Sequence, residues 1–361
     1  MNENVNRNRH RWGIIYVPKA GSLRPMKRWK EIREYLASKG VEYDFIQTEN
    51  FDSIERQARM FADNGYGTIV IAGGDGALQD TINGIMSSPN RDTVAMGIIP
   101  YGIANDYAGY WGMAVDDYKS AIDSIMTRRL RKVDVGCCIY SEDGEEKKRY
   151  FLNVLNIGVS AYIVELANKK RTFFAKVAYR VLGAFHLLFR RQNFRMRFRL
   201  NCQTVDKKLM MLFVGNSRGY GMTPSAVPYN GWLDVSAIRM PKFLGVLEGL
   251  HMLMRRRILN FKLVEPFRST DILIEDVGGA GIGIDGRPFK PSFPLHVVVE
   301  PETLNLIIPS KIYIKLSRIF EEKTQNIIYD NVQNEKIEEI RRKLLSMSKT
   351  FFSMKENFKC L

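Results

Sequence analysis

The sequence contains few cysteines, and their spacing matches no zinc site. Cys137, Cys138, Cys202 and Cys360 are the only four in the chain, and they do not form the closely spaced pairs that hold structural zinc. The adjacent Cys137 and Cys138 place their side chains on opposite faces of an extended chain. We interpret all four as reduced thiols, which predicts a cytoplasmic protein.

Long apolar runs are also missing. A helix needs about eighteen uncharged apolar residues to span a bilayer, and the best candidates, Val177 to Phe189 and Phe243 to Met254, are interrupted by Arg180 and Glu248. The first residues, MNENVNRNRHRW, are polar and lead directly into an apolar strand, so we expect no secretory signal.

Acidic residues are scarce relative to basic ones. The chain has 54 Lys and Arg against 39 Asp and Glu, a net charge of +15, and its isoelectric point is near 9.6. This balance implies an anionic partner such as ATP, an anionic lipid or a nucleic acid. With 361 residues, 45% of them hydrophobic, the chain is long enough for two domains.

The most informative stretch is Thr68 to Ile85, TIVIAGGDGALQDTINGI. Its β-branched start predicts a buried strand, its glycines predict a turn, and the residues from Ala77 predict a helix with Leu78 and Ile82 on one face. Glycines allow close approach of the backbone, and the start of a helix favours anions. The order of strand, turn and helix therefore indicates a phosphate-binding site.

A second segment repeats this arrangement. Ala95 to Pro100 is another apolar strand, and Tyr101 to Asp106, with Gly102 and Asn105, follows it. Alternating strands and helices predict a parallel, mostly buried sheet. Adjacent strands of such a sheet place both turns at its carboxyl edge, where open α/β sheets bind ligands.

With both segments in hand, the chain resembles a known family. GGDGALQDTINGI followed by IIPYGIANDYAGYWG is similar to the diacylglycerol kinase catalytic domain that bacterial lipid kinases and sphingosine kinases share. That family usually has GGDGT…NGL and P-x-GTANDFA. NAD kinases share the first motif but not the second, which makes them the more distant alternative.

The resemblance implies ATP as the nucleotide and assigns contacts to it. The implied contacts lie at the ends of three predicted strands: Thr48, Gly73, Gly74, Asp75, Gly76, Ala77, Leu78, Gln79, Gly102, Ile103, Asn105 and Asp106. The turn after the first strand, with Lys19 and Gly21, is a further candidate for phosphate binding. Ala77 and Ile103 stand where the family has threonines.

The resemblance also implies a catalytic base. Asp285 matches the family aspartate proposed to deprotonate the lipid hydroxyl, although Asp-Gly is also a favoured hairpin turn. Arg287 replaces the family glutamate, and we expect it either to lower the pKa of Asp285 or to pair with the transferred phosphate. Asp75, and with it Asp80, is expected to organise Mg²⁺ through water. Asp75 is thus both a catalytic and a metal candidate.

A second, structural magnesium ion is implied for the loop Asn216 to Asp234. Its ligands would be the backbone oxygens of Val227 and Trp232 together with Asn230, which replaces the family aspartate. Losing that charge weakens a site for a hard cation. Ser160 likewise stands at a position where the family has an aspartate.

A basic segment suggests a membrane surface. From Leu166 to Val205 there is no acidic residue, and arginines including Arg190, Arg191 and Arg195 alternate with aromatic residues. One interpretation is a core-facing helix and strand with basic outer faces. The other, which we favour, is docking on anionic headgroups. No recognisable nucleic-acid module accompanies the charge, so we expect no nucleic acid as a partner.

These patterns divide the chain into parts. Residues 1–131 are predicted to form an α/β nucleotide-binding domain with a parallel sheet, and residues 132–300 a mainly antiparallel, β-sandwich-like domain for the lipid substrate. Ser141 to Arg149 is expected to be a charged hairpin loop. His296 to Val299 and Leu304 to Ile308 are expected as two strands, with residues 301–309 returning to the first domain. Residues 310–361 are predicted to form a basic, helical C-terminal tail that packs on its own protein or in a homodimer.

The function that follows is phosphate transfer from ATP to the hydroxyl of a membrane lipid. Diacylglycerol, a sphingoid base and a ceramide-like lipid all fit, and the expected location is the cytoplasm, at the inner face of the membrane. Two alternatives remain open at this point. One is a catalytically silent, membrane-associated scaffold that binds nucleotide or lipid, and the other is a NAD kinase-like enzyme.

Overall fold

A computed structural model of the chain describes residues 8–18, 25–48, 51–102, 105–115, 117–161, 192–201 and 203–310. The residues up to 309 form one compact unit, which we call the first unit.

Four parallel strands form the core of the amino-terminal part. They are β1 (Trp12–Tyr16), β2 (Tyr43–Gln47), β3 (Thr68–Gly73) and β4 (Ala95–Pro100), in the order β2-β1-β3-β4. The residues of β1, β3 and β4 are all buried, as expected for a sheet with both faces covered. The prediction of a parallel α/β sheet is confirmed.

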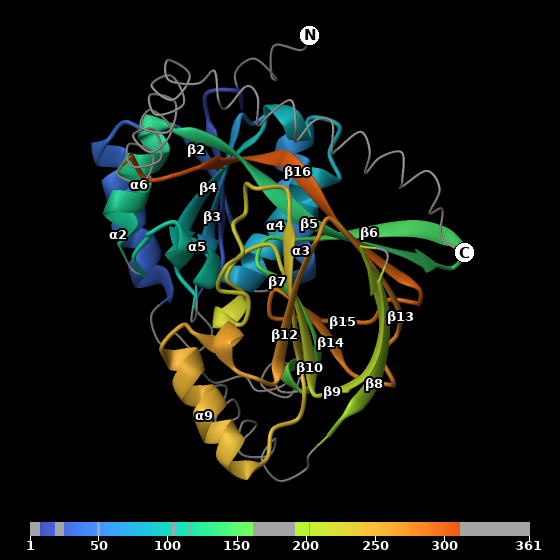
Figure 1. Cartoon of the computed structure of the whole chain (residues 1–361). Coiled ribbons are helices and arrows are strands. Elements are labelled where there is room, and N and C mark those ends of the chain that lie inside the picture. The colour runs from blue at the N-terminus through green and yellow to red at the C-terminus, as the bar shows by residue number, and fades with distance from the viewer. Residues whose placement is uncertain are drawn as a thin grey trace, which may run out of the picture. The chain divides into compact units, whose positions relative to one another are not determined.

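Helices cover both faces of these strands. Figure 1 shows α2 (Pro25–Ser38) and α6 (Tyr118–Thr127) on one face, and α3 (Phe51–Asp63) and α4 (Asp75–Met86) on the other. Trp29, Ile32 and Leu36 of α2 pack against the strands in the same cluster as Ile122 of α6. Alternate residues of each strand point toward the two helical layers.

The rest of the first unit is built from antiparallel strands. In the described residues, ten strands form one large sheet, ordered β2-β1-β3-β4-β16-β13-β8-β9, with β5 paired to β16 and β6 paired to β5. Six strands form a second sheet, ordered β12-β11-β10-β7-β14-β15. The carboxyl-terminal strands of the large sheet are β5 (Leu130–Glu142), β6 (Glu145–Phe151), β8 (Phe194–Leu200), β9 (Gln203–Leu209), β13 (Asp271–Asp276) and β16 (Leu295–Ile307). Those of the small sheet are β7 (Val154–Gly158), β10 (Met211–Gly215), β11 (Leu233–Ile238), β12 (Val264–Ser269), β14 (Ile282–Ile284) and β15 (Arg287–Phe289).

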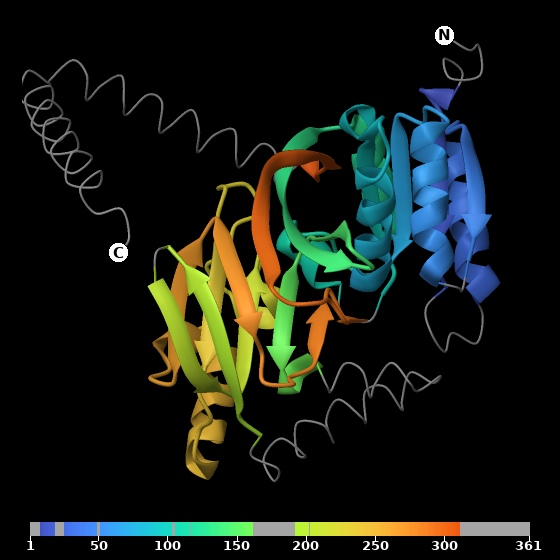
Figure 2. The ribbon, with the colours of Figure 1, turned by 90° about the vertical axis from the view of Figure 1, so that its right-hand side faces the viewer.

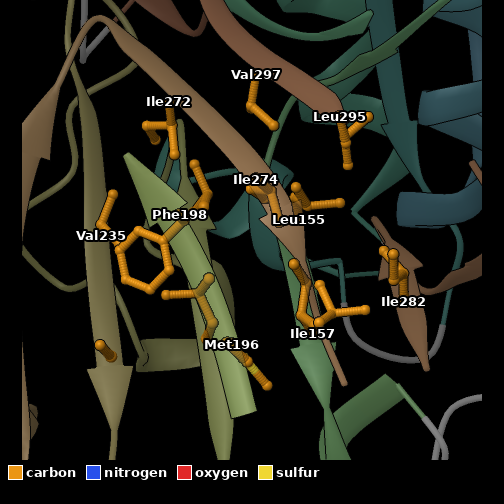
Figure 3. Close-up of a cluster of buried hydrophobic side chains, with 14 of the residues drawn as sticks. Leu155, Ile157, Met196, Phe198, Val235, Ile272, Ile274, Ile282, Leu295 and Val297 are labelled. Carbon is orange, nitrogen blue, oxygen red and sulfur yellow. The ribbon is translucent and has the colours of Figure 1, made fainter. Parts of the chain in front are cut away.

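The two sheets pack face to face. Figure 3 shows Phe198, Ile272 and Ile274 of the large sheet meeting Leu155 and Val235 of the small one. In β8, apolar residues face this core while the arginines between them are exposed. This alternation is typical of a half-buried strand. The predicted antiparallel, sandwich-like part is confirmed.

Two predictions about the strands are wrong. Ser141 to Arg149 is not a loop: β5 and β6 pair up to Glu142 and Glu145, and only Asp143 and Gly144 form the turn. Charged residues are tolerated there because this two-stranded ribbon is largely exposed. The expected strands at 296–299 and 304–308 are one strand, β16, whose pairing with β5 is irregular only between Glu300 and Leu304.

Strand β16 joins the two parts of this unit. It pairs in parallel with β4 at Asn305 and Leu306, and antiparallel with β5 and β13. Figure 2 shows it passing between the helix-flanked strands and the antiparallel part. The division at residues 131 and 300 remains our proposal, since the large sheet is continuous across it.

Gly84 allows α3 and α4 to pack closely. A Cβ atom at this position would lie 2.2 Å from the carbonyl oxygen of Glu55 and 2.7 Å from the Cβ of Ala58. Because a backbone oxygen cannot move aside cheaply, we expect Gly84→Ala to lower the free energy of unfolding by about 2 to 3 kcal/mol. The measurement is chemical denaturation.

Gly109, in the short helix α5 (Asp106–Tyr110), provides the control for this prediction. A Cβ atom there meets nothing within 4 Å. Gly109→Ala is therefore expected to be neutral or to stabilise the protein by up to about 1 kcal/mol. Equal effects of the two substitutions would contradict the packing role of Gly84.

Candidate functional site

The candidate site lies at the carboxyl edge of the parallel sheet. Strands β3 and β4 are in register up to Gly73 and Pro100, so the turns that follow them begin side by side. Thr48 follows β2 at the same edge and donates its backbone N–H to the carbonyl of Tyr16. The predicted placement of both turns at one edge is confirmed.

The two turns touch each other through their glycines. A Cβ atom on Gly74 would lie 2.9 Å from the Cα of Gly102, and one on Gly102 would lie 2.3 Å from the Cα of Gly74. Any other residue at either position would push the turns apart. The glycines therefore bring two loops together as well as leaving their backbone accessible.

Asn105 closes the second turn. Its Oδ1 accepts a hydrogen bond from the N–H of Gly102 at 2.8 Å, and its Nδ2 donates to the carbonyl of the same residue at 2.8 Å. Asn105 has a left-handed backbone with φ of 53°, which asparagine tolerates better than most residues. This side chain thus holds the turn in shape at the start of α5.

Asp75 connects the first turn to the second. Its carboxylate accepts hydrogen bonds from the N–H groups of Asp106 and Tyr107, both at 3.1 Å, and so caps the amino terminus of α5. Burial raises the pKa of Asp75 above its ordinary value, although these N–H groups oppose the shift. No local pattern indicates this cap, because the partners are 31 and 32 residues apart in the sequence.

Several predicted nucleotide contacts have buried side chains. Ala77, Leu78 and Gln79 are between 0% and 4% exposed, and Thr48 is 7% exposed with its hydroxyl bonded to that of Ser53. The side chains of α4 therefore face the protein, and what the helix start offers a ligand is its backbone N–H groups and the positive end of its dipole.

Asp80 lies between two arginines. Its Oδ1 is 3.2 Å from Nη2 of Arg149, and its Oδ2 is 2.7 Å from Nη2 of Arg287. Arg149 also pairs with Glu55 of α3. Burial raises the pKa of Asp80, and the two guanidinium groups counter that shift. These cations compete directly with any metal ion for the carboxylate.

Arg287 comes from β15 and reaches the first glycine turn. A Cβ atom on Gly76 would lie 3.0 Å from Nε and 3.1 Å from Cζ of Arg287. The guanidinium group therefore lies against the start of α4, where a larger residue would make it shift. A residue of the antiparallel part is thus in contact with the predicted phosphate-binding motif.

Asp285 forms the tight turn between β14 and β15. Asp285 and Gly286 both have positive φ, 44° and 80°, as expected for a two-residue hairpin turn. The carboxylate is 2% exposed, and it accepts hydrogen bonds from the N–H groups of Leu152, Asn153 and Val154 at 2.7 to 3.2 Å.

Burial raises the pKa of Asp285 to about 7, and the nearby charge of Asp75 adds to the shift, while the backbone N–H groups oppose it. The prediction that Arg287 would lower this pKa is wrong. Arg287 directs its guanidinium group to Asp80, so burial determines the ionisation of Asp285.

The residues predicted to hold a structural magnesium ion do not fit one. The Oδ1 of Asn230 accepts the N–H of Trp232 at 3.0 Å, and the carbonyl of Val227 accepts the N–H of Tyr229 at 2.8 Å. No carboxylate is among the three predicted ligands. In the described part of the chain, no group of three or more His, Cys, Asp or Glu is arranged to hold a metal.

Asp134 anchors this loop instead. Its Oδ2 accepts the N–H of Gly231 at 2.6 Å, and its Oδ1 accepts the N–H of Glu302 at 2.9 Å. It is 1% exposed. Asp134 is not among the site residues predicted from the sequence. The available signal for this role is a charged residue within the apolar run of a buried strand.

Some predicted site residues lie outside the described residues. These are Lys19, Gly21, Ile103, Arg190, Arg191 and the tail from residue 311 onward. Arg195 is described, and it pairs with Asp206 at 2.8 Å across β8 and β9. Its charge is therefore offset locally. No described helix has the length and apolar character needed to cross a bilayer.

Two family models match the chain. Residues 11–138 match the diacylglycerol kinase catalytic domain, and residues 153–308 match the YegS C-terminal NAD kinase beta sandwich-like domain. Residues 11–138 belong to the diacylglycerol kinase catalytic domain family. Asp75 and Asp106 lie in the first match, and Asp285 and Arg287 in the second.

Relatives and solved structures agree with this assignment. A diacylglycerol kinase of Staphylococcus saprophyticus is 27% identical over 221 residues, which cover 61% of this chain and 68% of that protein. One from Staphylococcus aureus is 26% identical over 224 residues, 61% of this chain and 66% of that protein.

The fold is also found in a solved structure from Bacillus anthracis strain Sterne, described as a diacylglycerol kinase. It has a TM-score of 0.60 at 17% identity and covers 84% of this chain and 98% of its own. A second structure from that organism has a TM-score of 0.67 at 19% identity, with the same coverage.

Proposed function

We propose that this protein is a lipid kinase, which transfers the γ-phosphate of ATP to the hydroxyl of a membrane lipid such as diacylglycerol, a sphingoid base or a ceramide-like lipid. The contact between Arg287 and Gly76 carries the proposal. It brings the hairpin that contains Asp285 to the glycine turn of the family's nucleotide motif. The relatives named diacylglycerol kinase support the same reaction class.

The proposed position of ATP is along the start of α4 and the turn from Gly102 to Asp106. Backbone N–H groups and the helix dipole favour phosphate at such a position. The proposed contact at Thr48 belongs to the same edge of the sheet. The proposed phosphate contacts at Lys19 and Gly21 follow β1 in the sequence and lie outside the described residues. Arg287, already at Gly76, is the cation placed to reach a terminal phosphate.

Magnesium fits the nucleotide turns better than the loop near Asn230. Mg²⁺ bound with nucleotides typically takes one or two carboxylates and keeps several waters, and the carboxylate of Asp75 accepts the backbone N–H of Asp106, the next candidate ligand, at 3.1 Å. We assign the ion to these two residues rather than to Asp80, which two arginines occupy. When bound, the ion would neutralise charge on the transferring phosphate.

Asp285 is the proposed base. A carboxylate with a pKa of about 7 is well suited to accept a proton from a hydroxyl near neutral pH. The four hydrogen bonds from the N–H groups of residues 152–154 occupy both of its oxygens. One of these hydrogen bonds must therefore break when the lipid hydroxyl binds to the carboxylate.

We expect Asp75→Asn to reduce phosphate transfer by about 100-fold or more, because the variant loses the charge that attracts magnesium. Asp106 and Tyr107 donate to different oxygens of Asp75. Asparagine keeps one acceptor oxygen but its Nδ2 cannot accept the other N–H group, so the melting temperature should also fall by a few degrees. Steady-state assays across a magnesium titration, together with thermal melts, measure both effects. A fully active variant would remove Asp75 from the metal site.

The experiment for the function itself is a lipid panel. Purified protein is incubated with labelled ATP, magnesium and diacylglycerol, sphingosine, ceramide or phosphatidylglycerol in detergent micelles, with NAD as a non-lipid acceptor. Transfer to one of the lipids supports the proposal. Transfer to NAD alone would replace it with a NAD kinase-like activity.

A catalytically silent scaffold is the second candidate, and one observation favours it. The guanidinium group of Arg287 covers the glycine turn, and the family glutamate is absent from this position. Nucleotide or lipid binding by calorimetry, without transfer to any acceptor in the panel, would support the scaffold. In either case we propose a cytoplasmic protein at the inner face of the membrane. We also propose that it forms a homodimer.

A further inference from the structure

Helix α9 (Phe243–Met254) exposes an apolar face. Leu247, Leu250 and Met254 are 58%, 46% and 77% exposed. Nine large hydrophobic side chains among the described residues are at least 39% exposed, and three of them lie on this one helix. Their spacing of three and four residues places them on one side. We call Leu247, Leu250 and Met254 the α9 apolar face.

The opposite side of α9 is packed. A Cβ atom on Gly249 would lie 3.3 Å from the ring of Phe261, and one on Gly245 would lie 3.8 Å from it. Met252 and Leu253 pack against the same cluster. One side of the helix therefore packs within the fold, and the α9 apolar face is exposed apolar surface that this packing does not use.

Three exposed arginines follow the helix directly. Arg255, Arg256 and Arg257 begin where the α9 apolar face ends, and they form no ion pair within the described residues. Arg195, Arg197 and Arg199 of β8, in contrast, each pair with an aspartate or glutamate. The uncompensated positive charge thus lies beside the exposed apolar side chains.

The position of α9 links this surface to the proposed base. Leu253 contacts the backbone at Gly221, where a Cβ atom would lie 3.1 Å from its Cδ1. The adjacent Tyr220 lies beside Gly286, where a Cβ atom would be 3.3 Å from its hydroxyl. One loop therefore separates α9 from the turn that contains Asp285. Figure 1 shows α9 at the lower left, outside the two sheets.

We propose that the α9 apolar face and Arg255 to Arg257 form a surface that docks on an anionic lipid bilayer. Apolar side chains beside a basic cluster are the combination that binds the headgroup region of such membranes. The inference rests on the proposed lipid kinase for the identity of the partner. This surface differs from the one predicted at Arg190, Arg191 and Arg195: the first two lie outside the described residues, and the charge of Arg195 is offset by Asp206.

The test is flotation of the full-length protein with vesicles. The vesicles contain phosphatidylcholine alone or phosphatidylcholine with phosphatidylglycerol, at low and high salt. We expect the wild type to bind the anionic vesicles in a salt-dependent manner. Leu247→Gln combined with Leu250→Gln and Met254→Gln should weaken this binding by about tenfold or more, and Arg255→Gln combined with Arg256→Gln and Arg257→Gln by a similar factor.

Matched substitutions elsewhere control for exposure and charge. Met60 and Met126 are exposed on α3 and α6, and their change to Gln should leave vesicle binding unaltered. Arg33→Gln with Arg56→Gln and Lys132→Gln removes three exposed cations from other elements. If these controls weaken vesicle binding as much as the α9 variants, binding depends on overall charge or apolar exposure and not on one surface, and the proposed surface is wrong.

A second copy of this chain is the competing partner for the α9 apolar face. Light scattering of the wild type and the apolar variant distinguishes the two: loss of a dimer without loss of vesicle binding would overturn the proposal. A comparison of phosphate transfer on micelles and on vesicles separates membrane docking from catalysis. The α9 variants should retain phosphate transfer to lipid in detergent micelles while losing phosphate transfer to lipid in vesicles. A wild type that binds anionic vesicles through α9 but phosphorylates no lipid would disprove the kinase and leave the docking surface intact.

Discussion

Asp285→Asn is expected to reduce phosphate transfer by about 100- to 10,000-fold, the range that a positioned general base contributes. The wild-type rate should rise with pH through about 7, because the buried carboxyl of Asp285 has a pKa of about 7 and must be ionised to accept a proton. The variant has no such group, and its residual rate should not show this rise. A pH profile of transfer to micellar lipid measures both.

The same carboxyl should make folding depend on pH. The folded pKa of about 7 lies above the ordinary value of 3.8, so the folded state binds the proton more tightly than the unfolded state. Its contribution to stability is therefore complete below about pH 4 and is lost as the pH rises through about 7, on the order of 4 kcal/mol in all. Asp285→Asn should remove this pH dependence.

Asp143 provides a matched control for Asp285. It occupies the Asp-Gly turn of the β5–β6 hairpin, with a φ of 52°, but it is exposed. Asp143→Asn should change neither the transfer rate nor the pH dependence of unfolding. If Asp285→Asn lowers stability at every pH but retains the activity of this control, Asp285 is an anchor for residues 152–154 and not a base.

Arg287→Ala is expected to reduce transfer by about 100- to 1,000-fold, if the guanidinium group beside Gly76 neutralises charge on the phosphate as arginines do in other phosphotransferases. It should also destabilise the protein by about 2 kcal/mol, because the buried Asp80 loses its partner at 2.7 Å. Steady-state kinetics with ATP as the varied substrate and urea denaturation measure the two effects.

Arg149→Ala separates these two roles. Arg149 also pairs with Asp80, at 3.2 Å, but it is Arg287 that lies against Gly76. The Arg149 variant should lose similar stability while retaining most of its transfer rate. If both variants lose activity in proportion to stability, the Asp80 network is structural and Arg287 has no contact with the phosphate.

The features that follow from local pattern could be predicted well. Helix α9 runs from Phe243 to Met254 and β4 from Ala95 to Pro100, as the apolar runs indicated. The two glycine turns meet because consecutive strands of a parallel sheet are usually neighbours. The Asp-Gly dipeptide at 285 and 286 forms the hairpin turn that its composition favours.

The features that depend on distant residues could not be predicted. Arg287 and Asp80 are 207 residues apart, and no pattern along the chain indicates that they pair. The pKa of Asp285 was misjudged for the same reason: sequence shows a neighbouring arginine but not the burial that outweighs it. The cap that Asp75 forms on α5 is likewise a contact between two separate motifs.

Strand β16 has a mechanical consequence for substrate entry. Because it is hydrogen-bonded to β4 as well as to β13, the two halves of the first unit cannot swing freely like domains joined by a linker. Any hinge motion has to occur where the pairing of β16 with β5 is interrupted, between Glu300 and Leu304. We therefore expect access to the buried carboxylate of Asp285 to come from local rearrangement of the loops around it rather than from large-scale opening.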